Sequence, residues 1–436
     1  MKQFKTLVKL WLPLVLTLFF LAPHALAGGL PTATPEEVGM SSEKLAALKG
    51  ISEKYIADNK IAGTVVLMVK DGKVFYYDAV GNADTGKPMQ KDSIFRIASM
   101  SKAITTVATM ILYEEGRLDL DDKLPKYIPE FAKPNVLVRN KGKDRKEKPY
   151  FIVPARREIT IRDLLTHTSG VTYCFWGRRY LADLYLEAGI SDGLTQTEGT
   201  IGEMMAKLGK LPLFFHPGEK WEYGLNNDVL GRVIEVASGM PFDKFLEKRI
   251  FKPLGMKDTF FFVPKDKVDR LTAIYSHTKA GPLRRLGDEP EKMGKYLVHS
   301  ASYHYKGPRT YFSGGGGLAS TAMDYALFLQ MIVNGGELNG VRIINNKSIT
   351  TMTTNQVGNL KAWGAKWGFG GLVPNGPTEN WYVWGGHFYT SFWADMDKKM
   401  IGVVLCQLDR ENTDHNKKIW NAVGAATLNK LSLIHI

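Results

Sequence analysis

The sequence has little of what marks metalloenzymes, disulfide-rich proteins and membrane proteins. Only two cysteines occur among its 436 residues, Cys174 and Cys406, and they form neither a disulfide framework nor a metal-ligand pattern. One disulfide between them stays an open alternative. The nine histidines include no H-E-x-x-H and no H-x-H, so the sequence does not indicate a zinc hydrolase. No internal repeat is present, and only the first 27 residues contain a long apolar run.

Three short motifs resemble known binding or catalytic signatures but lack the flanking residues or secondary structure that those signatures require. Gly81 to Lys87 spells G-x-x-x-x-G-K, but Pro88 replaces the hydroxyl residue that holds magnesium, so we expect a loop. The segment 189–193 spells G-x-S-x-G, but a helix-like segment precedes it where a nucleophile elbow needs a strand. We expect a helix stop and turn there. The glycines 314–317 lack a dinucleotide register and predict a flexible edge beside a pocket.

The composition is that of a globular protein with a basic surface. Hydrophobic residues make up 44% and charged residues 23%, and the length suits one or two domains. The net charge is +13, which is compatible with nucleic-acid binding or with scattered surface charge. The densest basic run, 139–148, contains two acidic residues and no aromatic residue. It predicts a solvated loop, and we expect no nucleic-acid partner.

The first residues are typical of a secretory signal peptide. Lys2, Lys5 and Lys9 surround the start of an apolar run from Leu10 to Leu21, and Ala25-Leu26-Ala27 forms a cleavage site. An N-terminal membrane anchor is the alternative, although the run is short for a span. We expect cleavage near Ala27, a periplasmic or secreted protein, and no stable membrane insertion afterwards. The apolar tail 431–436 resembles translated adapter sequence, which predicts a segment foreign to the protein.

The hydrophobic pattern predicts strands at both ends of the chain and helices between them. Asp71-Gly72 joins two β-rich runs and is a strong hairpin signal. Strands are expected at 62–69, 73–80, 367–373, 381–385, 391–395 and 400–408. Helices are expected at 41–58, 99–115, 228–238, 241–251, 321–334 and 415–426. The prediction is an α+β fold: one antiparallel sheet from about 35–98 and 313–430, with a mostly helical lobe inserted at about 99–312.

The motif S-x-x-K occurs at Ser41, Ser99 and Ser276, and only its context distinguishes the three copies. Ser41 opens a helix with a polar face and is expected to cap it. Ser276 lies in a polar segment that predicts a loop. Ser99 ends the run Ile94 to Ala98 and begins the most apolar helix of the mature chain.

Ser99 and Lys102 lie one helical turn apart and should project on the same face. Burial lowers the pKa of a lysine, so its neutral amine can accept the proton of a serine hydroxyl. The start of the helix offers backbone N–H groups where an oxyanion would form. The structural alternative is a helix-capping serine beside an ion-paired lysine.

The segments around these residues resemble those of serine β-lactamase-fold hydrolases. The similar phrases, in order, are Ser99-Met100-Ser101-Lys102, Ile159 to Gly170, His216-Pro217-Gly218 followed by Tyr223, Pro253 to Thr259, and Gly314 to Asp324. Together they span about residues 35 to 425. The resemblance implies Ser99 as nucleophile, Lys102 as its base partner and Tyr223 as a second proton carrier. A tyrosine beside a lysine cation is expected to have a lowered pKa.

Two departures from the β-lactamase pattern favour esters as substrates. Tyr223-Gly224-Leu225 replaces Tyr-x-Asn, and Asn226 and Asn227 are expected to cap the next helix instead. Lys-Thr-Gly is absent, and Trp384-Gly385-Gly386-His387 stands in its place. This resembles the Trp-Gly-Gly of family VIII carboxylesterases, where Trp384 offers an apolar wall instead of a cation for a substrate carboxylate. By the same resemblance, the His387 backbone N–H is the second oxyanion donor.

The sequence therefore predicts a serine hydrolase that cleaves carboxylic esters with short to medium acyl chains through an acyl-enzyme. No metal or organic cofactor is expected. One alternative keeps the nucleophile but takes an amide, such as a β-lactam or a cell-wall peptide containing D-amino acids. A second alternative is an envelope binding protein that keeps the pocket without useful turnover.

Overall fold

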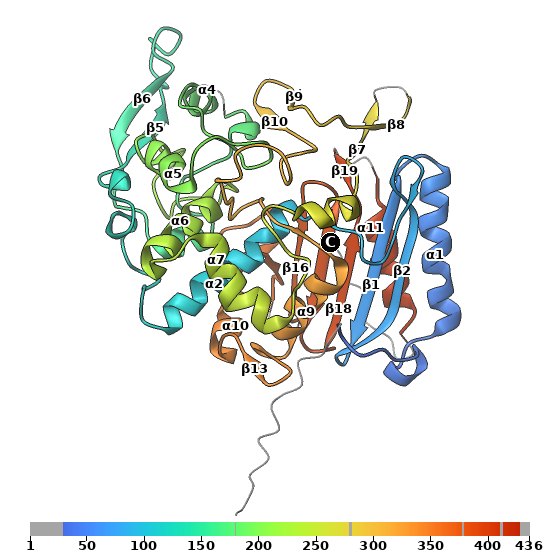
Figure 1. Cartoon of the computed structure of the whole chain (residues 1–436). Coiled ribbons are helices and arrows are strands. Elements are labelled where there is room, and N and C mark those ends of the chain that lie inside the picture. Colours follow the sequence, from blue (N-terminus) through green and yellow to red (C-terminus); the bar gives the residue numbers. More distant parts are fainter. Residues whose placement is uncertain (1–28, 179, 279–280, 377–378, 410–412, 428–436) are drawn as a thin grey trace, which may run out of the picture.

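The computed structural model describes residues 29–427 apart from 179, 279–280, 377–378 and 410–412 (Figure 1). The expected signal peptide and the tail 431–436 lie outside the described residues. Within the described ranges, no helix is long and apolar enough to cross a membrane. Cys174 and Cys406 are both buried as free thiols, so they do not form the disulfide that the sequence left open.

An antiparallel sheet of eight strands brings the two ends of the chain together (Figure 1). The strand order is β14-β15-β16-β17-β18-β1-β2-β3. These strands are β1 (Gly63–Lys70), β2 (Lys73–Asp84), β3 (Lys87–Pro88), β14 (Lys366–Trp367), β15 (Leu372–Val373), β16 (Trp381–Gly386), β17 (Thr390–Asp395) and β18 (Met400–Leu405). Asp71 and Gly72 both have positive φ, as a two-residue hairpin turn requires. The predicted α+β fold with one sheet from both termini is confirmed.

Helices cover both faces of this sheet, which explains why its central strands are apolar throughout. The helices α1 (Ser42–Ala57) and α11 (His415–Ala425) pack on each other and cover one face. Helix α9 (Ala322–Val333) packs on β1 and β18 from the other face. Val66 of β1 faces the first layer and Leu67 faces the second, so both are fully shielded.

The inserted lobe packs around α2, which is buried along most of its length and contacts α6. Its helices are α2 (Ser101–Glu114), α3 (Ile161–Leu165), α4 (Tyr180–Glu187), α5 (Ile201–Gly209), α6 (Asn226–Ser238), α7 (Phe242–Leu246) and α8 (Lys252–Leu254). Helix α10 (Asn346–Met352) follows α9 in the chain. Figure 1 shows α2 running through the lobe, and the turn before it packs on β16 of the sheet. An apolar helix at this boundary can present one end to both parts of the molecule.

Short strands, which the sequence did not predict, also occur in and beside the lobe. They are β5 (Asn135–Arg139), β6 (Tyr150–Pro154), β7 (Tyr275–Thr278), β8 (Gly281–Arg285), β9 (Glu291–Met293) and β10 (Leu297–His299). Four further two-residue strands are β4 (Phe95–Arg96), β11 (Ala319–Ser320), β12 (Glu337–Leu338) and β13 (Val341–Arg342), and β19 (Leu408–Asp409) pairs with β7. The basic run forms the exposed loop between β5 and β6, as predicted.

Several predicted elements differ in detail. Gly81 to Lys87 is not a loop but the end of β2, a turn and the start of β3. The expected strand 367–373 divides into β14 and β15, which pair as a hairpin. The expected helix 241–251 changes after α7 into a π-helical turn, Glu247–Phe251. Ser276 lies in β7, whereas Ser41 caps α1 as predicted by accepting the Lys44 N–H.

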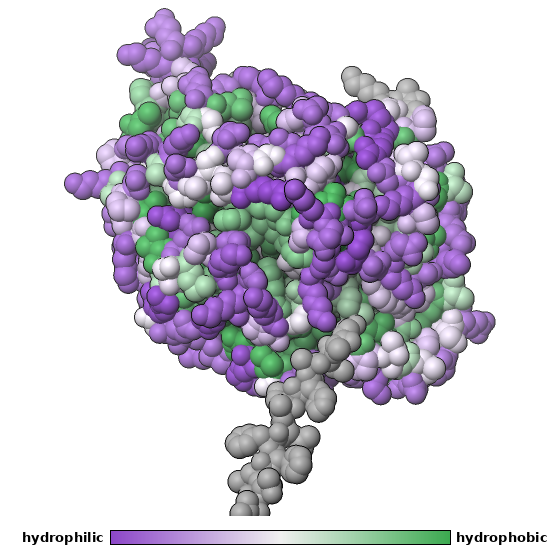
Figure 2. All heavy atoms as spheres, viewed as in Figure 1, coloured by the Kyte–Doolittle hydropathy of each residue, from purple (hydrophilic) through white to green (hydrophobic). Residues whose placement is uncertain are grey.

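Polar side chains cover most of the face shown in Figure 2, with apolar side chains in a hollow near its centre. A groove of about 610 Å³ beside α7 is lined by an aromatic cluster that includes Phe251, Phe260, Phe261, Phe262 and Phe312. None of the predicted site residues lines this groove. The predicted site residues lie instead around the start of α2.

Candidate active site

Ser99 sits in a sharp turn that leads into the buried helix α2. The helix itself begins at Ser101, and a 3₁₀ turn (Ala98–Met100) precedes it. Ala98 has φ 42°, a left-handed conformation that costs a residue with a side chain about 1–2 kcal/mol. Ser99 is partly exposed between the buried Ala98 and Met100. Its backbone N–H donates to no other described residue, so it is available to bind an oxyanion.

Lys102 lies fully buried behind this serine and contacts three oxygen atoms. Its Nζ lies 3.2 Å from Ser99 Oγ, 2.9 Å from the Tyr173 hydroxyl and 2.7 Å from the Gly315 carbonyl oxygen. Burial lowers the pKa of Lys102 to about 7, and the charge of Asp228 opposes this shift. A neutral amine can donate to Gly315 and Tyr173 while its lone pair accepts the Ser99 proton. The contacts thus fit a lysine that acts as a base.

Tyr223 faces the same two residues from the segment before α6. Lys102 Nζ lies 4.5 Å from the centre of the Tyr223 ring. The Tyr223 hydroxyl is buried and has no hydrogen-bond partner in the described ranges. Burial raises the pKa of Tyr223, and the nearby Ser99 hydroxyl and Trp384 indole only partly oppose this. The expected lowered pKa is therefore wrong, because desolvation dominates over the contacts of the hydroxyl, and Tyr223 is a neutral phenol.

Tyr173 is a site residue that the sequence did not reveal. It is buried and its hydroxyl accepts a hydrogen bond from Lys102. Burial, reinforced by Tyr223 and Asp228, raises the pKa of Tyr173 well above its usual value. The residue follows the predicted family phrase 159–170 by three positions, but nothing in its local pattern marks it as functional.

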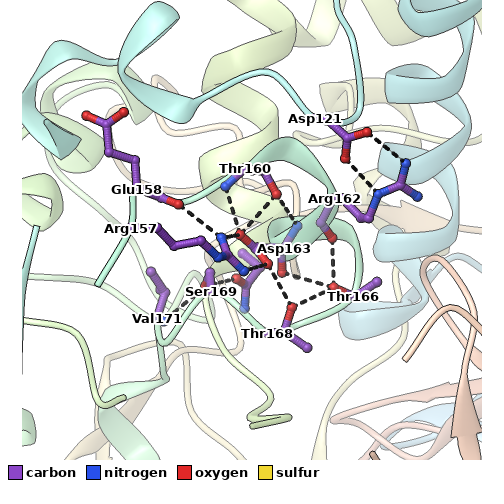
Figure 3. A network of polar contacts seen from close by, with 11 residues as sticks. Asp121, Arg157, Glu158, Thr160, Arg162, Asp163, Thr166, Thr168, Ser169 and Val171 are labelled. Atoms are coloured by element: carbon purple, nitrogen blue, oxygen red, sulfur yellow. Dashed lines mark hydrogen bonds and ion pairs between the residues drawn. The ribbon is translucent and has the colours of Figure 1, made fainter. Parts of the chain in front are cut away.

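A network of polar contacts holds the segment 159–170 in place (Figure 3). Asp163 closes a capping box with Thr160 at the start of α3, and Arg157 and Thr168 also bind its carboxylate. The network fixes the turn that contains His167, whose φ is 56°.

His167 connects this turn directly to the segment that carries Tyr223. Its Nδ1 lies 2.8 Å from Asn226 Nδ2 and accepts the Gly224 N–H at 3.3 Å. Its ring centre lies 4.9 Å from that of Tyr223. Asn226 is therefore a buried support and not a helix cap, and α6 has no side-chain cap at all. The predicted capping role of Asn226 and Asn227 is wrong, because both side chains make contacts with distant parts of the chain. Asn226 contacts His167, and Asn227 Nδ2 lies 3.5 Å from the Lys102 carbonyl oxygen.

The glycines 314–317 form a tightly packed wall of the site. The predicted flexible edge is wrong, because all four residues are buried and the Gly314 carbonyl accepts the Thr105 hydroxyl. A Cβ on Gly315 would lie 2.5 Å from Asp228 Oδ2, 3.0 Å from the Tyr173 hydroxyl and 3.4 Å from Lys102 Nζ. Glycine is thus required here for close approach of the backbone to the lysine.

The end of β16 places the segment 384–387 against the turn of Ser99. A Cβ on Gly386 would overlap the Ile97 carbonyl oxygen, so only glycine lets the strand approach this closely. The His387 backbone N–H donates to no described residue. The structure therefore brings Ser99, Lys102, Tyr223 and the segment Trp384 to His387 into one place.

Aromatic rings line the site around Tyr223. Trp384 stacks on Trp363 with ring centres 5.5 Å apart, and its indole N–H has no partner among the described residues. Trp363 is 58% exposed and also contacts Trp176 and Trp221. A wall of aromatic rings such as this suits a substrate with apolar or aromatic groups.

Comparison with known proteins finds hydrolases with a similar sequence and fold. The family model described as Beta-lactamase matches residues 48–427. Esterase EstB of Burkholderia gladioli is 32% identical over 305 residues, covering 68% of this chain and 72% of EstB. A Salmonella typhimurium protein described as a D-alanyl-D-alanine carboxypeptidase is 27% identical over 343 residues, covering 74% of this chain and 72% of that protein. The solved structure of EstCE1, a hydrolase with promiscuous acyltransferase activity, superposes with a TM-score of 0.74 at 27% identity and covers 87% of this chain and 98% of EstCE1.

Proposed function

The chain belongs to the β-lactamase family, and on that premise we propose that it is a serine esterase that acts through an acyl-enzyme on Ser99. The observation that carries the proposal is the contact between Ser99 Oγ and a fully buried Lys102 of lowered pKa. Relatives include both an esterase and a protein described as a D-alanyl-D-alanine carboxypeptidase, so the family alone does not fix the substrate. The aromatic wall around Trp384 favours neutral esters.

The first half of the proposed reaction forms the acyl-enzyme. Lys102 Nζ takes the proton of the Ser99 hydroxyl while Ser99 Oγ forms a bond to the ester carbonyl carbon. The oxyanion is held by the backbone N–H groups of Ser99 and His387. The bond between carbon and the alcohol oxygen then breaks, and the proton from Lys102 passes to the departing oxygen with the Tyr223 hydroxyl as carrier.

The second half releases the acid. A water molecule loses a proton to the same Lys102 and Tyr223 pair and attacks the acyl carbon. The bond to Ser99 Oγ breaks, and the serine regains its proton from Lys102. The product acid leaves, and each group returns to its starting protonation state.

The substrate class is tested by assaying a short-chain p-nitrophenyl ester and a chromogenic cephalosporin in parallel with the mature chain. We expect fast ester turnover and little cephalosporin turnover. Efficient cephalosporin turnover would contradict the ester preference, because it would mean that another residue grips the β-lactam carboxylate. A stable acyl adduct without turnover would favour the alternative of a binding protein.

The reaction should lose activity in acid. Lys102 accepts a proton only when neutral, and its pKa is lowered to about 7. Below that pKa the ammonium form predominates, so kcat/KM for a neutral ester should fall about tenfold per pH unit. A pH profile from about 5 to 9 with a neutral ester checks this. Activity that stays constant down to the acid end, or that is lost only in alkali, would contradict a base role for Lys102.

The two tyrosines should differ when each is replaced by phenylalanine. Tyr223→Phe removes the proposed proton carrier and should lower kcat by about 10²- to 10³-fold. Tyr173→Phe removes only an acceptor of the Lys102 ammonium, so kcat should fall by about tenfold. Losing that acceptor disfavours the charged lysine, so the acid limb of the pH profile should move to lower pH. Equal losses with an unmoved acid limb would contradict these separate roles.

We also propose that the enzyme works in the periplasm or outside the cell, as the signal-peptide pattern at residues 1–27 indicates. Fractionation of cells that express the full chain tests this proposal. Recovery of a shortened chain in the periplasm or medium is expected, and a full-length chain in the cytoplasm would contradict it.

A further inference from the structure

The side chains of two histidines and an aspartate meet beside the proposed oxyanion site, and the esterase reaction uses none of these three side chains. The cluster consists of His299 at the end of β10, Asp409 at the end of β19, and His387 directly after β16. One ligand atom from each side chain lies within 4.8 Å of the other two. His299 and Asp409 are fully buried, whereas a quarter of the His387 side chain is exposed.

The donor atoms are spaced as the corners of a small metal site. Asp409 Oδ1 is hydrogen-bonded to His387 Nε2 at 3.1 Å and lies 3.4 Å from His299 Nδ1. Tetrahedral zinc with bonds of about 2.0–2.1 Å holds its ligand atoms about 3.3 Å apart, so these two separations match such an edge.

His299 gives a second and independent sign of a missing ligand. Both of its ring nitrogens are buried without a hydrogen-bond partner among the described residues. His299 Nδ1 lies at ion-pair distance from Asp409 Oδ1, but the two atoms do not have the geometry of a hydrogen bond. Leaving such a buried group unpaired is unfavourable, whereas a metal ion would use its lone pair.

Among the described residues, Asp409 also has no cationic partner from Lys or Arg. Across the described ranges its ion-pair contacts are the two histidines alone, and the Ser276 hydroxyl reaches its other oxygen at 3.5 Å. A buried carboxylate is stable when it is paired or bound to a metal. Two imidazoles and one carboxylate are the ligand set of three-ligand zinc sites with an open fourth position.

We propose that His299, His387 and Asp409 form a binding site for a divalent transition-metal ion of the zinc type, with water as a fourth ligand. The partly exposed His387 provides the side from which the ion and the water reach the buried pair. The ion ties the ends of β10, β16 and β19 together. It thereby also holds the His387 backbone N–H, which the proposed esterase reaction uses, although the metal site itself does not depend on that reaction.

The test is a titration of the mature, tag-free protein with Co²⁺ after treatment with a chelator. Tetrahedral Co²⁺ absorbs visible light, so binding has a readout that is independent of activity. We expect saturation at one Co²⁺ per chain, displacement by Zn²⁺, and a higher melting temperature with Zn²⁺. The absence of saturable binding by the wild-type chain would overturn the proposal whatever the variants do.

Variants identify the ligands. His299→Ala and His387→Ala should each weaken Co²⁺ binding on the order of 100-fold or more. His277→Ala is the matched control, because His277 lies on the neighbouring strand β7 but outside the cluster, and it should bind Co²⁺ as the wild type does. If His299→Ala fails to fold, the partly exposed His387→Ala still decides the outcome. Unchanged binding in a folded His387→Ala variant would overturn the assignment.

Discussion

Replacing Ser99 with alanine is expected to abolish ester turnover, with a loss on the order of 10⁶-fold in kcat. Lys102 and the backbone N–H groups remain, but without the Oγ no covalent intermediate can form. The fold should persist, because Ser99 is partly exposed and Lys102 keeps its contacts with Tyr173 and Gly315. Kinetics with a short-chain p-nitrophenyl ester measure the loss, and a thermal unfolding transition verifies the fold.

Ser41→Ala is the matched control, because Ser41 carries the same S-x-x-K motif in a different setting. Its hydroxyl caps α1 on the surface, so its loss should lower the free energy of unfolding by about 1 kcal/mol and leave turnover unchanged. A Ser99→Ala chain that is folded and still active would remove Ser99 from the reaction. Loss of turnover in Ser41→Ala would mean that the assay reports stability instead of chemistry.

Lys102→Met is expected to have the second-largest effect, a loss of about 10⁴-fold or more in kcat. Methionine is unbranched and apolar, so it can fill the buried space of the lysine stem without the amine. The variant also loses the acid limb of the pH profile near pH 7, because the titrating amine is gone. Pre-steady-state kinetics should show that formation of the acyl-enzyme is the slowed step.

Lys44→Met provides the control for the lysine, since Lys44 lies exposed in the surface copy of the motif. It should leave both kcat and the pH profile unchanged. A Lys102→Met chain with near-normal kcat, or with an acid limb that persists, would show that another group takes the Ser99 proton.

The sequence predicted the sheet and the central residues of the site because these depend on local patterns. The Asp71-Gly72 turn between two β-rich runs predicted the first hairpin directly, and β1 and β2 do pair around it. Ser99 differed from the two other motif copies by the apolar helix after it, and the structure does bury that helix. The segment 384–387 was located from its resemblance to family VIII carboxylesterases, and β16 does end beside Ser99.

The remaining features depend on contacts between distant parts of the chain. Tyr173 and His167 acquire their roles only when α3, α6 and the start of α2 meet. The pKa of Tyr223 is raised, against the prediction, because burial dominates at this site and a sequence does not show burial. The cluster of His299, His387 and Asp409 comes from three separate strand ends, so no spacing motif could reveal it.

The short strands of the lobe were missed for a related reason. Strands such as β9 and β10 are only three residues long, and their pairing is set by the partner strand and not by their own pattern. The glycines 314–317 looked flexible in sequence, yet Gly315 is required because its backbone lies against Asp228 and Lys102. A glycine in a sequence is compatible with a flexible backbone or with close packing of the backbone against other atoms. Only its neighbours in the folded structure distinguish the two.

The most direct test of the account is mass spectrometry of the acyl-enzyme. The mature chain is mixed with an activated short-chain ester, quenched in acid during turnover and digested. The account predicts a mass increase of one acyl group on the peptide that contains Ser99, lost when the quench is delayed until the substrate is exhausted. Fragmentation should place the adduct on Ser99 itself. Ester turnover with the acyl group on another residue, or with no adduct even in the slowed Tyr223→Phe variant, would contradict the central claim.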